Sequence, residues 1–142
     1  MATFVKFNKF LEQLAEKAYN LGSDTLKFAL TNTAPTPATD TGFLPGTLHP
    51  PPAAANGYTT GGHAATISGS SESGGTYTLA TVTDVVITAT AGGIGPFRYV
   101  ILYDDTAAND ELIAYWDYGS SITLNVTETF TIDVTASLLT IT

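Results

Sequence analysis

The chain has 142 residues, enough for one domain with a proper core but too few for two typical domains. Charged residues make up only 13%, the formal net charge is −8, cysteine is absent, and threonine occurs 25 times. This composition excludes disulfides and thiolate metal sites, argues against a general nucleic-acid binder with a basic face, and favours a mainly β body.

Positive and negative charges are separated along the chain. Four of the five basic residues lie in the first 27 positions beside three acids, whereas residues 28–142 carry ten acids and one base, Arg98. The first part therefore sums to +1 and the second to −9. No stretch approaches the roughly 18 consecutive apolar residues of a transmembrane helix. We interpret residues 1–142 as a single domain and expect neither a nucleic-acid nor a membrane partner.

The first segment has apolar residues at steps of three and four, among them Phe4, Phe7, Leu11 and Leu14. This spacing predicts an amphipathic helix over residues 3–21, with Thr3 as its N-cap and a stop at Leu21-Gly22. We expect the helix to pack across the sheet of its own domain. The alternative is a helix that binds a membrane surface or a partner. Its polar face is not strongly cationic, which weakens the membrane alternative.

The next segment begins with a clear strand pattern over Thr25–Asn32, where apolar and polar residues alternate. Residues 34–57 then contain six of the seven prolines, which disfavours regular sheet because proline lacks an amide donor. Two interpretations stay open: an extended arm that lies on a neighbouring subunit, or a loose surface loop. Phe43, Leu44 and Leu48 are apolar enough to dock on another surface.

Residues 58–142 form the main β body, in which short apolar runs alternate with glycine-rich or acidic turns. The spacing of these runs predicts a jelly-roll-like antiparallel β-sandwich. Two runs, Phe97–Tyr103 and Leu112–Tyr118, are apolar on both faces and must be covered on both. In Phe97–Tyr103 we expect the odd-numbered residues to share one face. The second cover would come from the N-terminal helix or from another subunit.

No catalytic, cofactor or metal site is expected. His49 and His63 have no nearby histidine or carboxylate at the spacing of metal ligands. The densest acidic group could offer oxygen ligands to calcium, but its spacing misses the EF-hand pattern. A solvated turn between two apolar strands is the favoured interpretation of this group, which comprises Asp104, Asp105, Asp110 and Glu111.

Two further features are candidate interaction sites. Arg98 either pairs with Asp117 or Asp84, or reaches across a subunit interface. Aromatic residues follow one another closely and could form a flat sugar-binding platform, although core packing is favoured for two of them. These residues are Tyr115, Trp116 and Tyr118, of which Trp116 and Tyr118 are the two expected in the core.

Several strings in the chain resemble small structural proteins of tailed bacteriophages. The main strings are Gly95–Tyr103, Tyr115–Leu124 and Glu128–Asp133, supported by Ser23–Asn32, Asn56–Tyr58 and Gly74–Tyr77. Members of this group look like capsid decoration, or cement, proteins of the jelly-roll type. The resemblance covers nearly the whole chain except the proline-rich segment.

The resemblance implies a virion structural protein without enzymatic activity or cofactor. It would bind the outer surface of the capsid, across boundaries between major capsid protein subunits. A homodimer is the first expectation because two-fold assemblies are the commonest, and a trimer is the second. The alternatives are a tail or fibre component of the same particle, or a carbohydrate-binding β-sandwich that uses Tyr115, Trp116 and Tyr118 for attachment.

Overall fold

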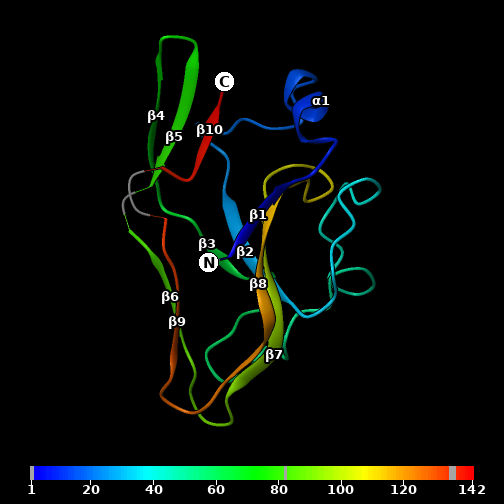
Figure 1. Ribbon diagram of the computed structural model, residues 1–142, viewed down its shortest axis with the longest axis vertical. Coiled ribbons are helices and arrows are strands. Elements are labelled where there is room, and N and C mark those ends of the chain that lie inside the picture. The colour runs from blue at the N-terminus through cyan, green and yellow to red at the C-terminus, as the bar shows by residue number, and fades with distance from the viewer. Residues whose placement is uncertain (1, 82, 135–136) are drawn as a thin grey trace.

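The computed structural model describes residues 2–81, 83–134 and 137–142, and within them the protein is mainly β with antiparallel sheets (Figure 1). A single short helix accompanies the strands in these residues. In chain order the elements are β1 (Thr3–Lys6), α1 (Phe10–Ala15), β2 (Leu26–Thr31), β3 (His63–Ala64), β4 (Ile67–Ser73), β5 (Thr76–Thr81), β6 (Val85–Thr88), β7 (Ile94–Asp104), β8 (Leu112–Leu124), β9 (Thr129–Ile132) and β10 (Leu139–Ile141).

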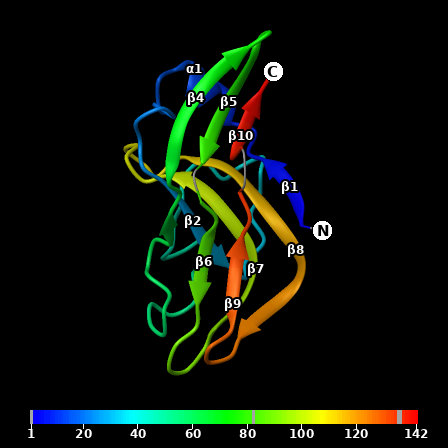
Figure 2. The same cartoon turned by 90° about the vertical axis from the view of Figure 1, so that its left-hand side faces the viewer.

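The strands form one large sheet and two small ones. The large sheet has the order β1-β8-β7-β2-β3, with the long strands β7 and β8 near its centre. The small sheets have the orders β10-β5-β4 and β6-β9. Because β5 leads into β6 and β9 leads towards β10, the two small sheets continue one another along the face of the large sheet (Figure 2).

Two apolar clusters lie on opposite faces of the large sheet. The larger cluster joins Phe28 and Leu102 of that sheet to Leu79, Ile87 and Leu139 of the small sheets. The smaller cluster covers the other face and consists of Phe7, Ala29, Phe43, Ile101, Tyr103 and Leu112. The expectation that Phe97–Tyr103 and Leu112–Tyr118 are covered on both faces is therefore confirmed except at Tyr118, which was expected in the core but is exposed. The second cover comes from Phe7 and from the proline-rich segment, and neither a long helix nor a second subunit is needed for it.

The predicted helix over residues 3–21 is wrong. Residues 3–6 form the edge strand β1, which pairs with β8 in the register Thr3↔Asp117 to Lys6↔Ala114. A three-residue step places Phe4 and Phe7 on opposite faces of an extended chain. Phe7 indeed lies in the smaller cluster, whereas Phe4 contacts Trp116, which packs against the larger one. The helix that does form, α1, starts after Lys9 and ends where Lys17 adopts a left-handed conformation with φ 63°.

The proline-rich segment, residues 34–57, is irregular but packs on its own domain. Its one described bridge joins Gly42 to Glu111, and the backbone N–H of Phe43 donates to the Asp110 carbonyl. Figure 1 shows this segment, in cyan and blue-green, along the side of the large sheet away from the small sheets. The interpretation as a loose loop is therefore wrong, because the segment is anchored on its own sheet. Contact of this segment with a neighbouring subunit stays a prediction.

The register of β7 shifts twice near its start. The pairing with β8 moves between Ile94 and Phe97, and again between Phe97 and Tyr99. Phe97 pairs with Ile122 and Tyr99 with Asp117, so the extra residues lie in β8 and the regular ladder, with its alternation of faces, is interrupted between these pairs. Phe97 accordingly lies in the larger cluster, whereas Ile101 and Tyr103 lie in the smaller one. The expectation that these odd-numbered residues share one face is wrong for Phe97.

Candidate interaction site

The three apolar residues predicted to dock from the proline-rich segment have different environments. Phe43 is buried and stacks on Tyr103, with ring centroids 4.5 Å apart. Leu44 and Leu48 are 48% and 43% exposed. Phe43 therefore anchors the segment to its own sheet, and only the two leucines remain on the surface for a partner.

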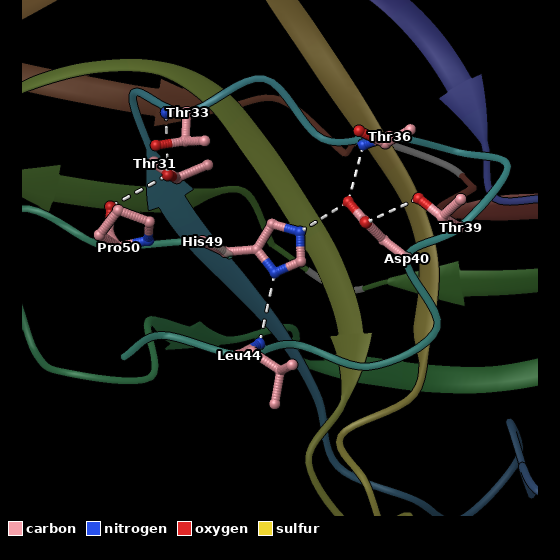
Figure 3. A network of polar contacts seen from close by, with 8 residues as sticks. All are labelled: Thr31, Thr33, Thr36, Thr39, Asp40, Leu44, His49 and Pro50. Carbon is pink, nitrogen blue, oxygen red and sulfur yellow. Dashed lines mark hydrogen bonds and ion pairs between the residues drawn. The ribbon is translucent and has the colours of Figure 1, made fainter. Parts of the chain in front are cut away.

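A polar network fixes the same segment (Figure 3). Asp40 Oδ2 accepts hydrogen bonds from the Thr36 backbone N–H, at 2.7 Å, and from His49 Nε2, at 3.2 Å. His49 Nδ1 accepts the backbone N–H of Leu44 at 3.3 Å. The imidazole thus has one nitrogen as donor and the other as acceptor, which is the neutral form.

Burial explains the protonation state of this histidine. The His49 side chain has no exposed surface and its ring stacks on Phe43 at 5.8 Å. Desolvation lowers the pKa of His49, although the hydrogen bond and the charge of Asp40 act in the opposite direction. Sequence reasoning missed this pair because the partners lie nine residues apart in an irregular segment, where no periodic pattern relates them.

Arg98 pairs with Asp117, one of the partners expected for it. Its Nε and Nη2 atoms donate to the two carboxylate oxygens at 2.7 and 2.8 Å, and its guanidinium lies 5.2 Å from the centre of the Tyr99 ring. The pair raises the pKa of Arg98 and lowers the pKa of Asp117. The charge of Arg98 is therefore neutralised within the chain.

The aromatic residues of β8 do not form one flat platform. Tyr115 contacts Phe7 and Tyr99 on one face of the large sheet, at centroid distances of 5.5 and 6.0 Å. Trp116 contacts Phe4 and Phe28 on the other face, at 5.4 and 5.9 Å. Successive residues of a strand point to opposite faces, so Tyr115 and Trp116 cannot stack on the same flat ligand.

A groove follows the side of the molecule where β1 and β8 face β9 and β10, and we call it the edge groove. It consists of three hollows of about 330, 320 and 170 Å³. The walls of the first and third hollows are mainly apolar, whereas the lining of the second is about half polar. Tyr118 is 53% exposed and Phe4 48%. Side chains that line one or more of the hollows include Ala2, Phe4, Lys6, Leu11, Trp116, Tyr118, Phe130, Val134, Leu138, Leu139 and Ile141.

The acidic group lies at the turn between β7 and β8, as expected, but the expectation that it is solvated is wrong for Asp104 and Glu111, which are buried. Asp104 is fully buried; its Oδ1 accepts the backbone N–H groups of Thr106 and Ala107, and its Oδ2 has no hydrogen-bond partner. Burial, with a smaller effect of the nearby Asp24, raises the pKa of Asp104 to about 6. Asp105 forms an ion pair with Lys27 at 2.7 Å. Within the described residues no three acidic or histidine side chains are placed to hold one metal ion.

Comparison with protein families, with curated proteins and with solved structures finds no match to this chain. Across the described part of the chain, no helix is long and apolar enough to cross a membrane.

Proposed function

We propose that this chain is a virion structural protein, and specifically a decoration protein that binds the outer surface of a tailed-phage capsid. The observation that carries the proposal is the edge groove: an apolar groove beside an open strand edge on a compact β body. The similarity of the Gly95–Tyr103, Tyr115–Leu124 and Glu128–Asp133 strings to phage structural proteins supports the same assignment. Such a role requires a stable body and a complementary surface, and no catalysis or cofactor.

The fold that we propose is a jelly-roll-like β-sandwich. The large sheet would form one layer, and the two small sheets together would form the other, with the larger apolar cluster between them. This arrangement suits a decoration protein because residues of both layers pack on a common core, so the body keeps its shape when a partner binds at its edge.

The proposed partners are the major capsid protein and a second copy of the chain, with a homodimer favoured over a trimer. Several modest contacts on one lattice add through effective concentration, so each single contact need not be strong. The opposite faces of Tyr115 and Trp116 give no support to the carbohydrate-binding alternative.

Cryo-electron microscopy of the phage that encodes this chain tests the proposal. We expect density for the domain at regular positions on the head, and its loss from particles made without the gene. Heads without the protein should release their DNA at a lower temperature, and added purified protein should restore the original temperature. Density on the tail would assign the chain to the tail instead. Absence of the chain from purified particles by mass spectrometry would contradict both roles.

A further inference from the structure

We propose that the edge groove binds an extended segment of another virion protein, which adds to β1 as a further strand. The segment would place alternate side chains into the hollows and one carboxylate beside Lys6. The identity of the partner as a virion protein rests on the proposed function. The mode of binding rests on the geometry of β1 and of the groove.

Strand β1 lies at an edge of the large sheet. Among the described strands, β1 has one neighbour, β8, to which it is antiparallel. In an antiparallel edge strand, alternate residues direct their N–H and C=O groups away from the neighbour. An exposed edge of this kind is a template for another extended chain, and such strand addition is a common mode of peptide recognition.

The hollows follow alternate residues of the N-terminal segment. Ala2 lines the 330 Å³ hollow, Phe4 lines the 320 Å³ and the 170 Å³ hollows, and Lys6 lines the 170 Å³ hollow. These residues follow one another at two-residue steps, so their side chains point to the same face of β1. An added strand has the same period of about 6.6 Å for two residues. Its alternate side chains would therefore meet successive hollows.

The wall of the groove opposite β1 carries apolar side chains. Phe130 and Val134 line the first hollow, Leu138 and Leu139 the second, and Leu139 and Ile141 the third. Apolar side chains of the added strand would bury this wall together with Phe4. Backbone hydrogen bonds to β1 would hold the segment in place, and the hollows would select its side chains.

The charges that line the groove favour a carboxylate on the incoming segment. Lys6 lies at one end of the groove and makes no ion pair with a described residue, whereas Lys9 pairs with Glu12 at 2.7 Å. Asp133, the acidic residue of the groove lining, is already engaged within the chain. A carboxylate on the incoming segment would complement Lys6. The β1 strand of a second copy, Thr3–Lys6, has no carboxylate to offer, which favours a different protein as the occupant.

A synthetic peptide tests the binding mode without any particle. The probe is acetyl-Thr-Glu-Thr-Val-Thr-Val-Thr-amide, in which the glutamate and both valines share one face of a strand. We expect it to bind ¹⁵N-labelled protein with a Kd on the order of 1 mM. NMR shifts should be confined to β1, β9, β10 and the hollows, and exchange of the outward amides of β1 should slow. A peptide with proline in place of the two central threonines should not bind.

Matched variants test the charged contact and the apolar contact separately. Lys6→Glu should weaken binding of the peptide about fivefold at low salt, whereas Lys17→Glu, an exposed lysine outside the groove, should not change it. Phe4→Ser should weaken binding, and Leu44→Ser, which alters a side chain of the same 48% exposure, should not. Unchanged thermal unfolding of each variant would show that the fold is intact.

The outcomes separate this inference from the proposed function. If the protein binds phage heads but does not bind the peptide, and Lys6→Glu and Phe4→Ser do not change binding, the inference is overturned and the proposed function stands. If the peptide binds as expected and heads carry no density, the proposed function fails alone. Sedimentation of the free protein tests whether a second copy of the chain occupies the groove. A dimer that Phe4→Ser dissociates would assign the groove to a second copy and overturn the inference.

Discussion

The proline-rich segment and the strand β1 show opposite relations between regular structure and burial. Residues 34–57 have hardly any regular backbone pairing, yet Asp40, Phe43 and His49 within them are buried and hydrogen-bonded or stacked. Strand β1 is regular and fully paired on one side, yet three of its four residues are exposed. Regular backbone structure therefore does not show which part of this chain is buried and which part is exposed to a partner.

The reason for the difference is where each segment finds its hydrogen-bond partners. The proline-rich segment obtains them from side chains and from isolated backbone groups, so no edge remains for another chain to extend. Strand β1 obtains them from β8 alone and keeps an open side. Three substitutions test this comparison, and a fourth, Asp104→Asn, tests burial at the end of β7; they follow in order of decreasing expected effect.

The largest effect is expected for Phe43→Ala. Loss of a buried phenylalanine costs about 3–5 kcal/mol in the free energy of unfolding, and here it also removes the ring between Tyr103 and His49. Urea unfolding at pH 7.5 measures this loss in the free energy of unfolding. Leu44→Ala, next in the chain and 48% exposed, is the control and should change the free energy by about 0.5 kcal/mol or less. Equal effects of both changes would mean that the segment is not anchored as described.

The next effect is expected for His49→Phe, which keeps a ring on Phe43 and removes both hydrogen bonds. The loss should be about 1–3 kcal/mol at pH 7.5, because Asp40 and the Leu44 N–H each lose a partner. The variant should also be less sensitive to acid. Since the pKa of His49 in the folded protein lies below its ordinary 6.5, its contribution to stability is present above pH 6.5 and is lost as the pH falls below that value.

Unfolding curves between pH 7.5 and 5 check this prediction. His63, whose pKa is also lowered by burial, contributes in the same direction, so the difference between the variant and the parent protein is the quantity of interest. If the two curves lose stability in parallel as the pH falls, His49 is not held neutral by the network.

A smaller effect of opposite sign is expected for Asp104→Asn. The pKa of Asp104 is raised to about 6 from an ordinary value of 3.8, so its contribution to stability is present below pH 4 and is lost as the pH rises through 6. Asparagine retains the oxygen that accepts the Thr106 and Ala107 N–H groups and carries no charge. At pH 7.5 the variant should be more stable by about 1 kcal/mol. At pH 4 this advantage should disappear, and a gain that is independent of pH would contradict the assignment.

The smallest effect is expected for Tyr118→Ser in the edge groove. This side chain is 53% exposed, so its removal should change the free energy of unfolding by less than about 1 kcal/mol. Thermal unfolding measures it, with Val126→Ser, at a turn and 51% exposed, as the control. A loss as large as that of Phe43→Ala would show that the groove is part of the core and is not an open surface.

Strand β2 could be predicted from the sequence because its pattern is compatible with a single kind of regular structure. The alternation over Thr25–Asn32 corresponds to β2, Leu26–Thr31, because alternation at period two fits no other regular element. The first segment could not be predicted so simply, since steps of three fit both one face of a helix and two faces of a strand. The choice between helix and strand depends on the edge of β8, which offers backbone partners to residues 3–6.

The candidate site depended on information that is not local in the sequence. The pairing of Arg98 with Asp117 was among the expected alternatives, because opposite charges on neighbouring strands were foreseeable. The register shifts of β7 and the Asp40–His49 pair were not, because each depends on how segments meet in space. The edge groove combines side chains from both ends of the chain, and no local pattern relates them.

The two walls of the edge groove also form at a different stage of folding from the rest of the molecule. Strands β7 and β8 are neighbours in the sequence and can pair after closing only a short turn. β1 must find β8, and β10 must find β5, across most or a large part of the chain. Closing long loops costs more entropy and slows folding. We expect the groove to be completed last during folding and to open first when the native protein fluctuates.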